Sequence, residues 1–508
     1  MGDDRQGWGP LLDDLERRLA AARAMGGREK LEKRRAEGRL NARERVARLL
    51  DGESFAELGA LAGAAREAGE APSPADGFVA GFGRIEGRPV LVGAEDFTVQ
   101  GGSIGLEGAD KRYRLTQLAA QERVPLVFVL EGGGHRMSNA LRRHGRGPND
   151  LQGLASLSGL VPTVCVVLGA SAGHGALAAP LMDFVVMGEG AALFAAGPPL
   201  VLASLGERVD KETLGGAAVH VEQSGVAHNV APDDGAALDV ARTYLSYFPT
   251  NAWQAPPRRS GPDAGERRLD GILELVPPDP RRPYPMRRLL ESVFDAGSVF
   301  EVQPRYGASL VTALAFLGGQ AVALVANDPS VRTGTLDTAA AEKGARFLEV
   351  VGSFHLPAVF LADNPGVLAG TRAERAGALR AGARMFAAQH RLASPKLSVT
   401  LRKAFGFGSS IMAMNPFDAQ TVSLAFPGVT LGAMPAAGGG AASKADAETQ
   451  TAFDRTEQAG PWRIASTLGF DDVIDPRELR NALLRALALA RTRLAGPFAP
   501  VARVGVLP

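Results

Sequence analysis

The sequence has little cysteine and no recognisable metal-binding pattern. Cys165 is the one cysteine among 508 residues, so no internal disulfide and no zinc site built on cysteine pairs can form. The HExxH pattern and mixed clusters of cysteine and histidine are also absent. We therefore expect no bound metal, and we interpret Cys165, which lies in an apolar run, as a small core residue.

The sequence also lacks an excess of charge of either sign. Its 56 Lys plus Arg against 55 Asp plus Glu leave a formal net charge of +1, without a basic block. This balance argues against binding to nucleic acid or to an anionic membrane surface. No run of 18 apolar residues occurs, and the N-terminus MGDDRQGWGP has no apolar signal core. Together these absences predict a soluble cytoplasmic protein.

Glycine and proline, by contrast, are abundant. The chain has 62 Gly and 33 Pro, while 45% of its residues are hydrophobic. This composition is typical of a globular protein with many tight turns. The length predicts roughly two to four domains.

The first fifty residues have apolar side chains at helical spacing. We predict two helices between Leu11 and Leu50, broken at Gly26 and Gly27, that pack on the domain or on a neighbouring subunit. Further on, GFVAGFGRIEGRPVLVGAEDFTV predicts two short strands around a turn at Glu86. No helix pattern follows the glycines of GFGRIEG, which argues against a dinucleotide fingerprint there.

Comparing the chain with itself reveals a repeat, with an offset of 232 residues between its copies. The matched pairs are Gly87 with Gly319, Val90 with Val322, Asp96 with Asp328, Lys111 with Lys343, Arg114 with Arg346 and Pro125 with Pro357. After one inserted residue the matches continue with Pro162 on Pro395, Gly173 on Gly406 and Gly175 on Gly408. We therefore predict two copies of one α/β domain, at residues 1–255 and 286–508, joined by a linker rich in Pro and Arg at residues 256–285.

A small-residue turn follows a buried strand in each copy. The turns are SAGHGA and FGFGSS, and each is expected to open a helix, where several backbone N–H groups point the same way. Such a pair of donors can form an oxyanion hole, which we place at Gly173 with His174 and at Phe407 with Gly408. The alternative is that these glycines only permit tight turns or close helix packing.

Other catalytic machinery is largely missing. No GxxxxGK[ST] loop is present, so ATP binding by that route is not expected. Ser171 in VLGASAGHGAL formally matches the GxSxG elbow, which leaves a serine hydrolase as a rival hypothesis. That rival requires Asp and His to follow in one hydrolase domain, and it does not explain a second copy of the domain.

Several segments together resemble one family. They are DFTVQGGSIG, EGGGHRM, SAGHGA and LGGAAVHVEQSGVAH in the first half, and RPYPMR, TLDTAAAEKGARF, DNPGVLAGT and RKAFGFGSSIM in the second. In this order, from Glu16 to Pro508, they resemble the carboxyltransferase β subunits of biotin-dependent acetyl-CoA and propionyl-CoA carboxylases. The resemblance implies an α/β fold of two tandem crotonase-like domains (ββα superhelices), assembled as hexamers with active sites shared between subunits.

The same resemblance implies a reaction. The chain is expected to move a carboxyl group from carboxybiotin to the α-carbon of acetyl-CoA or propionyl-CoA, through an enolate. The N–H groups of Gly173 and His174 would hold the thioester oxygen, and those of Phe407 and Gly408 the ureido oxygen of biotin. Further positions implied to bind substrate or cofactor are Lys111, Gly133, Gly134, Arg136, Gly366 and Ser410.

The resemblance also implies a partner. No lysine of the chain sits beside a methionine, so a biotinylation site of the Ala-Met-Lys-Met type is absent. Biotin, its carrier and the ATP-dependent biotin carboxylase are therefore expected on a partner α subunit. A related decarboxylase that runs the half-reaction in reverse stays open as an alternative.

The chain departs from the family pattern at functional positions. His174 and Phe407 stand where the family usually has glycine. The imidazole of His174 can cover the thioester, donate to it or fill space, and filling space is our first interpretation. Ser410 occupies a position that helps to select the acyl chain in related enzymes, and serine there leaves acetyl-CoA and propionyl-CoA both open.

Overall fold

The chain folds into two compact units. The computed structural model describes residues 5–63, 73–141, 147, 149–261, 263–415 and 419–501, so the outermost ends of the expected domains lie outside the described residues. One unit runs to Ser246 and the next begins at Tyr247. The units thus divide somewhat before the boundary expected at residue 255. Among the described residues, no helix is long and apolar enough to cross a membrane.

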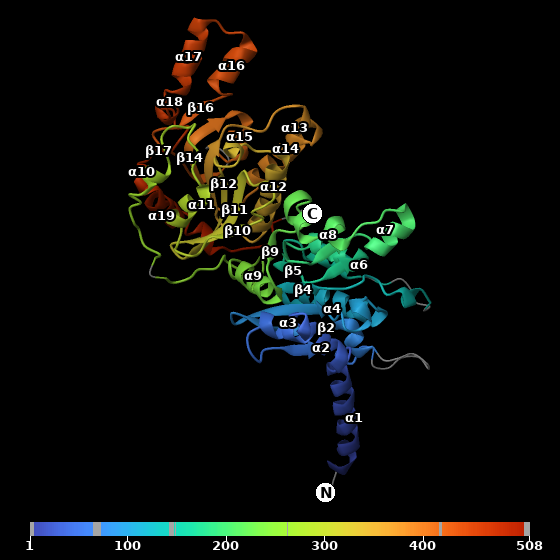
Figure 1. Ribbon diagram of the computed structural model, residues 1–508. Coiled ribbons are helices and arrows are strands. Elements are labelled where there is room, and N and C mark those ends of the chain that lie inside the picture. Colours follow the sequence, from blue (N-terminus) through green and yellow to red (C-terminus); the bar gives the residue numbers. More distant parts are fainter. Residues whose placement is uncertain are drawn as a thin grey trace. The chain divides into compact units, whose positions relative to one another are not determined.

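A mixed sheet forms the centre of the first unit (Figure 1). Its strands, in spatial order, are β1 (Ala56–Leu58), β2 (Phe78–Ile85), β3 (Arg88–Glu95), β4 (Leu126–Leu130), β5 (Thr163–Val167), β7 (Phe184–Gly188) and β9 (Asn229–Ala231). The first three pair antiparallel and the others parallel. Every residue of β4, LVFVL, and of β5, TVCVV, is buried. Strands covered on both faces have no solvated side, which explains these continuous apolar runs.

The helices of the first unit surround this sheet. They are α1 (Arg5–Arg23), α2 (Arg28–Ala36), α3 (Ala42–Leu49), α4 (Leu106–Glu122), α5 (Asp150–Leu157), α6 (Gly173–Leu181), α7 (Pro198–Leu205), α8 (Lys211–Gly215) and α9 (Asp234–Ser246). A short parallel pair, β6 (Ala170–Ala172) with β8 (Ala192–Phe194), lies beside it. The core gathers apolar residues of β4, β5, α4, α5 and α6.

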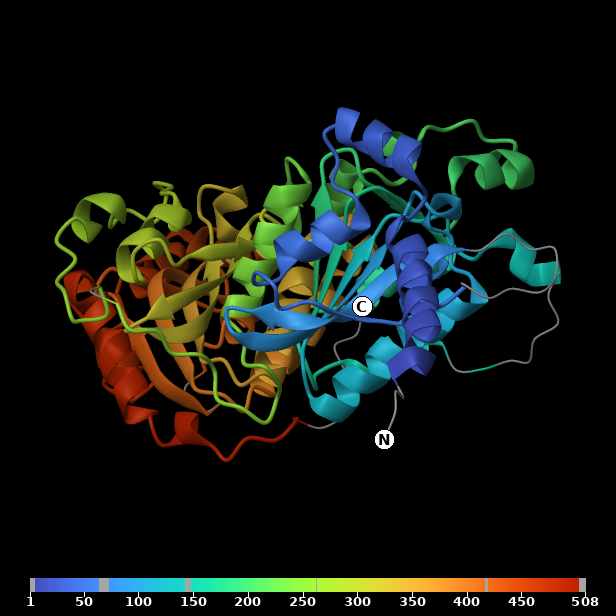
Figure 2. The ribbon, with the colours of Figure 1, turned by 90° about the horizontal axis from the view of Figure 1, so that it is seen from below.

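The leading segment forms α1, α2 and α3, so our prediction of two helices was wrong. A second break precedes Asn41, whose side chain accepts hydrogen bonds from the amides of Arg43 and Glu44 while Glu44 accepts from the Asn41 amide. This reciprocal capping box satisfies the free amides of a new helix and starts α3 there. Figure 2 shows the leading helices in dark blue, and Figure 1 shows that α1 extends away from the rest of the first unit.

The second unit has the same plan. Its sheet runs β10 (Phe300–Val302), β11 (Leu310–Leu317), β12 (Gln320–Asn327), β13 (Ala358–Asn364), β14 (Lys396–Phe405), β15 (Gln420–Ala425) and β17 (Asp472–Val473), with β16 (Thr430–Gly432) also paired to β14. Its helices are α10 (Ile272–Leu275), α11 (Met286–Val293), α12 (Thr338–Ser353), α13 (Thr371–Arg375), α14 (Ala378–His390), α15 (Gly406–Ile411), α16 (Ala436–Ser443), α17 (Ala447–Glu457), α18 (Trp462–Ala465) and α19 (Leu479–Leu489). In Figure 1, α16 and α17 project from this unit as a helical hairpin.

The segment expected to be a linker packs on the second unit. The amide of Arg259 donates to the carbonyl of Gly319 at 2.7 Å, and that of Ala321 donates to Pro257 at 3.0 Å. Ile272 and Tyr284 are buried in the core of the unit. Most of residues 256–285 therefore belong structurally to the second unit.

The two units confirm the predicted duplication. β2, β3, α4 and β4 begin 232 residues before β11, β12, α12 and β13, and β5 and α6 begin 233 residues before β14 and α15. Both hairpins turn through two residues of positive φ, which is the type I′ geometry that matches the twist of the strands. Gly173 and Gly406 each open a helix with a φ of 58°.

A buried carboxylate stands at the C-terminal end of the equivalent strand in both units. At the end of β4, Glu131 is paired with Arg34 at 2.7 Å, Arg39 at 3.2 Å and Arg45 at 2.6 Å. Burial favours a higher pKa for Glu131, but these guanidinium groups outweigh it and hold the pKa below its usual value. The three arginines come from α2, α3 and the loop between them, so they fasten the leading helices to the sheet.

In the second unit the corresponding carboxylate belongs to Asp363. It pairs with Arg402 at 2.8 Å and Lys403 at 3.2 Å. In the sequence Asp363 precedes the turn Asn364-Pro365-Gly366, which favours a capping role, and the structure shows that this prediction is wrong. The neighbouring Asn364 has that role, because its side-chain oxygen accepts from the Gly366 amide at 2.8 Å.

Replacing Arg45 by Met tests the contribution of the buried cluster. Arg45 is 1% exposed and also binds Asp234 at 2.8 Å, so its loss leaves buried carboxylate charge uncompensated. We expect the free energy of unfolding to fall by about 3 kcal/mol. The control is Arg28→Met, which removes an exposed pair with Glu32 and should cost about 0.5 kcal/mol or less. Equal urea midpoints for the two variants would contradict this assignment.

Candidate active site

The turn between β6 and α6 presents unpaired backbone donors. Gly173, His174 and Gly175 form the first turn of the helix, where amides have no acceptor within the helix. In the described part of the chain, neither the Gly173 nor the His174 amide donates to a carbonyl outside the helix. The amide of Ala172 instead donates to Gly132 at 3.1 Å, which ties this turn to the loop after β4.

That loop carries two of the predicted binding residues. Gly133 donates through its amide to Gly101 at 3.1 Å and is exposed. Gly134 has a φ of 77°, and a Cβ there would lie 2.7 Å from the Ala172 carbonyl oxygen. The structure therefore brings Gly133 and Gly134 against the turn that holds Gly173 and His174.

An apolar cavity of about 330 Å³ borders this turn. Gly173 lies at its edge, and Leu177, Leu193 and Phe194 are among the side chains that line it. The apolar lining suits an apolar part of a ligand, and the neighbouring amide donors suit a carbonyl oxygen on the same ligand.

The imidazole of His174 does more than fill space, so our first interpretation of it was incomplete. Its Nε2 pairs with the carboxylate of Asp150, the first residue of α5. The second oxygen of Asp150 accepts from Nε of Arg112 at 2.6 Å, and Arg112 also donates to Glu95 at 2.9 Å. These three partners are almost completely buried.

The charges of this network shift its pKa values in opposite directions. Burial favours a higher pKa for Asp150, but Arg112 and the hydrogen bond from His174 hold it well below the usual value. For Glu95 burial prevails and the pKa is raised, although Arg112 opposes the shift. Asp150 is therefore an ionised, acceptor-only carboxylate beside the imidazole.

Lys111 and Arg136 direct their charges to protein oxygens. The ammonium group of Lys111 donates to the carbonyls of Ala75, at 3.0 Å, and Phe78. Burial lowers the pKa of Lys111 to about 8. Arg136 pairs with Asp76 at 2.6 Å and donates to the Ser103 carbonyl at 2.9 Å. Their expected contact with CoA stays a prediction, and both side chains have a structural role in the described chain.

The second unit gathers the other predicted residues at α15. Phe407 and Gly408 lie in its first turn, and Ser410 follows on the same helix, with its hydroxyl 3.3 Å from Oδ1 of Asn415. A Cβ on Gly408 would lie 2.7 Å from Nδ2 of Asn364 and 3.0 Å from Cα of Gly366. Close packing therefore requires glycine at 408, whereas the Phe407 side chain is 55% exposed.

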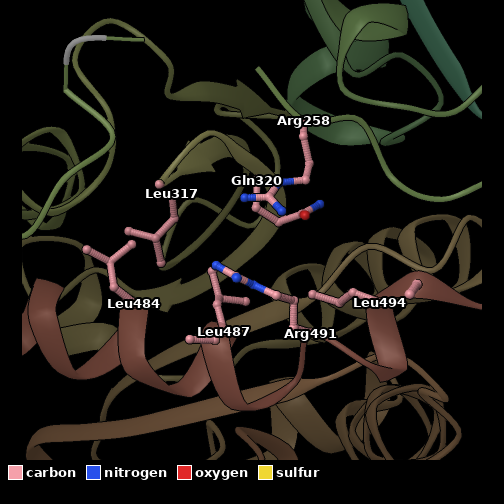
Figure 3. Close-up of a pocket in the computed structure, with 10 residues that line it drawn as sticks. Arg258, Leu317, Gln320, Leu484, Leu487, Arg491 and Leu494 are labelled. Atoms are coloured by element: carbon pink, nitrogen blue, oxygen red, sulfur yellow. The ribbon is translucent and has the colours of Figure 1, made fainter. Parts of the chain in front are cut away.

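Two cavities of the second unit contain none of the predicted residues. One, of about 390 Å³, lies between β16 and the α16–α17 hairpin and is lined by apolar residues such as Met434 and Phe453. The other, of about 250 Å³, is shown in Figure 3, where Arg258 and Arg491 reach toward a common space above leucines of α19. The first cavity nevertheless borders the turn that opens α15, because its lining residue Ala433 has a carbonyl oxygen that would lie 3.0 Å from a Cβ on Gly406.

Ser171 lacks the environment of a nucleophile. It is completely buried in β6, and its hydroxyl has no hydrogen-bond partner among the described residues. A nucleophilic serine needs an exposed oxygen that is hydrogen-bonded to a base, whereas Oγ of Ser171 is buried and has no such bond to any described residue. The serine hydrolase alternative is therefore wrong.

The prediction of Cys165 as a core residue is confirmed, and so is the role that the sequence SGVAH favours for His228, which is to fix a turn through hydrogen bonds. Cys165 is a buried core residue of β5. His228 fixes its turn by hydrogen bonds in both directions with the backbone of Val185, at 2.9 and 2.8 Å. Within the described residues, no group of three or more potential metal ligands is found.

Sequence reasoning missed Asp150, Arg112 and Glu95. They come from three separate elements, and no fixed spacing in the sequence connects them with His174. The one available signal was the departure from glycine at position 174 itself, since a titratable side chain at a helix start invites a search for its partner.

The two units repeat one α/β fold, and in each a glycine with a φ of 58° opens a helix. Residues 33–504 match the family model described as carboxyl transferase domain. The chain belongs to this family and is a carboxyltransferase of the biotin-dependent group that contains acyl-CoA carboxylases, transcarboxylases and decarboxylases.

Individual relatives are similar over nearly their whole length. The chain is 34% identical to the methylmalonyl-CoA decarboxylase subunit alpha of Veillonella parvula, over 95% of this chain and 96% of that protein. It is 33% identical to the propionyl-CoA carboxylase carboxyltransferase subunit of Haloferax mediterranei, with the same coverage. A crystal structure of transcarboxylase 12S, described as a hexamer with methylmalonyl-CoA bound, matches all of both chains with a TM-score of 0.90 and 32% identity. These matches confirm the crotonase-like architecture expected from the sequence.

Two glycine-to-alanine variants test whether close packing requires glycine at position 408 but not at the exposed position 133. Gly408→Ala places a methyl group 2.7 Å from Asn364, so we expect the free energy of unfolding to fall by about 1–3 kcal/mol. Gly133→Ala meets its nearest atom, the Gly101 carbonyl oxygen, only at 3.9 Å and should change stability by about 0.5 kcal/mol or less. Urea unfolding followed by circular dichroism measures both. A stable Gly408→Ala would show that the turn adapts.

Ser171→Ala tests the rejection of the hydrolase. The buried hydroxyl has no partner to lose, so stability should change by about 0.5 kcal/mol or less, and carboxyl transfer should persist. A fluorophosphonate reagent should leave the unmodified chain unlabelled while it labels an authentic serine hydrolase in a parallel sample. Mass spectrometric detection of a label on Ser171 would reverse the conclusion.

Proposed function

We propose that this chain transfers a carboxyl group between carboxybiotin on a partner protein and the α-carbon of a short-chain acyl-CoA, either acetyl-CoA or propionyl-CoA. The observation that carries the proposal is the pair of equivalent turns at Gly173 and Gly406, both with a φ of 58° at the start of a helix. Carboxyl transfer passes through two anions, one on each substrate. A duplicated fold with one donor turn per unit matches that requirement.

The turn of the first unit is assigned to the acyl-CoA. The amides of Gly173 and His174 donate to the thioester oxygen as it becomes an enolate oxygen. One preorganised donor of this kind typically contributes about 2.7–4 kcal/mol to the stability of the transition state. Exposed Gly133 leaves the neighbouring loop open to the ligand, and Gly134 lets that loop pack against the turn. The apolar cavity next to Gly173 receives the apolar part of the ligand.

The turn of the second unit is assigned to biotin. When bound, carboxybiotin supplies the carboxyl group. The amides of Phe407 and Gly408 point out of the first turn of α15, where a ureido oxygen can accept from them. Gly366 packs under Gly408 and shapes the turn, while Ser410 on the same helix is assigned to selecting the acyl chain.

The remaining expectations follow the same assignment. Lys111 and Arg136 are proposed to support the CoA side, in addition to their contacts with protein oxygens. Biotin is proposed to reside on a partner subunit that also provides the biotin carboxylase. A homohexamer is proposed because the similar transcarboxylase 12S structure is described as one.

A biotin-dependent decarboxylase is the second candidate. It is supported by the 34% identity to the subunit of methylmalonyl-CoA decarboxylase. Both candidates share the step in which a carboxyl group passes between an acyl-CoA and biotin, so the direction depends on the partner that turns over the carboxybiotin.

The shared step can be measured with the full-length chain and free biotin. We expect the chain to convert malonyl-CoA or methylmalonyl-CoA to acetyl-CoA or propionyl-CoA in a manner that depends on added biotin. Gly173→Ala should lower this rate by about 10²-fold or more, because a side chain at positive φ displaces the donor turn.

The matched control is Gly190→Ala. Gly190 also has a positive φ, of 77°, but lies in open space between β7 and β8. The Gly190→Ala variant should therefore be less stable, but its folded form should transfer the carboxyl group at the rate of the unmodified chain. Equal rates for both variants, or conversion without biotin, would contradict the proposed function.

A further inference from the structure

The two donor turns share a backbone but differ in the side chain that follows the glycine. In the first unit Nε2 of His174 pairs with the carboxylate of Asp150 in α5. In the second unit Phe407 occupies the equivalent place, and its ring lies beside Gly382 of α14, where a Cβ would be 3.8 Å from it. The histidine and its acid are thus present in one copy of the turn and replaced by apolar contact in the other.

The geometry fixes which nitrogen of His174 is free. An ionised carboxylate can only accept, so Nε2 of His174 carries the hydrogen that Asp150 receives. Asp150 is in turn held by Arg112 at 2.6 Å and cannot rotate away without breaking that buried ion pair. When the ring carries one hydrogen, Nδ1 keeps its lone pair, and no hydrogen bond to Nδ1 is found within the described ranges.

The neighbouring His135 is not seen to form a hydrogen bond with Nδ1 of His174. The ring of His135 meets the ring of His174 edge to face, with centroids 5.2 Å apart. Asn139 donates from Nδ2 to the Ile104 carbonyl at 3.0 Å and lies 3.2 Å from Nδ1 of His135, which therefore accepts. Each imidazole thus has a separate partner, and none of the described residues occupies Nδ1 of His174.

Packing alone does not require this arrangement. Without the imidazole, the charge of Asp150 would still be balanced by Arg112. The side chain of His174 is also not fully buried, since 15% of its surface is exposed. A base oriented by a buried carboxylate, next to oxyanion donors and without a nucleophile, is arranged for proton transfer.

We propose that His174 is a catalytic residue that removes and returns a proton at the α-carbon of the bound acyl-CoA, with Asp150 orienting its ring. This inference rests on the proposed function. The lone pair of Nδ1 takes the proton, the electrons of the C–H bond form the C=C bond of the enolate, and the carbonyl electrons move to the oxygen held by the Gly173 and His174 amides. The reverse step returns a proton from Nδ1 to the same carbon, so no co-reactant is consumed.

The consequence is an activity that needs no biotin. In deuterium oxide, the full-length chain alone should exchange the α-hydrogens of propionyl-CoA for deuterium, because the proton on Nδ1 equilibrates with solvent. Mass spectrometry of the recovered propionyl-CoA measures the exchange, against a sample without protein. His174→Gln should lower the rate by about 10²-fold or more, since its amide can donate to Asp150 but has no basic nitrogen.

Two further variants complete the test. His174→Gly removes the imidazole but keeps the backbone donors, and it should also lose exchange. His390→Gln changes an exposed histidine at the end of α14 and should exchange like the unmodified chain. Propionyl-CoA affinity, measured by calorimetry, should be similar in all four proteins.

The outcomes distinguish this inference from the function on which it rests. If the unmodified chain binds propionyl-CoA but exchanges no deuterium, or if His174→Gln exchanges equally well, the inference is overturned and the proposed function is not. If release of free CoA depends on His174 instead, the residue activates water and the proposal is wrong. If the unmodified chain does not bind propionyl-CoA, the proposed function fails, and this inference fails with it.

Discussion

The candidate site of the first unit depends on a buried cluster of ion pairs at the end of β4. Glu131 closes that strand and is held by arginines from the leading helices. The residues that follow it, from Gly132 to Arg136, form the loop to which the Ala172 amide binds. Removing charge from this cluster leaves uncompensated ions in a low-dielectric interior, which is costly. The position of the donor turn is therefore linked to helices that precede it by more than a hundred residues.

Duplication has preserved the backbone of the fold and changed its polar interior. The hairpin, the long helix and the strand order recur in both units, and the glycine that opens the donor helix has the same φ in each. The carboxylate at the C-terminal end of the third strand of the repeat also recurs, as Glu131 and as Asp363. Its partners differ, since leading helices supply them in the first unit and β14 supplies them in the second.

The side chains at the two turns have diverged in the same way. An imidazole bound to a buried carboxylate stands at one turn, and an exposed phenyl ring beside a glycine stands at the other. Backbone donors are common to both turns because they follow from the chain path alone, whereas acid and base groups need a complete set of partners. This difference is the physical basis for assigning distinct substrates to the two units.

The sequence by itself determined the duplicated α/β fold, its strand hairpins and the two glycine turns. Those features follow from local patterns: apolar runs, turn residues and a repeat that keeps its register. It also located His174 as a departure, but it did not identify the role of the side chain. The tertiary structure alone decided that Asp150, Arg112 and Glu95 meet beside it, that Ser171 is buried, and that Gly408 is required by contact with Asn364. These contacts join residues far apart in the chain, and their energies depend on burial and distance, which no local pattern specifies.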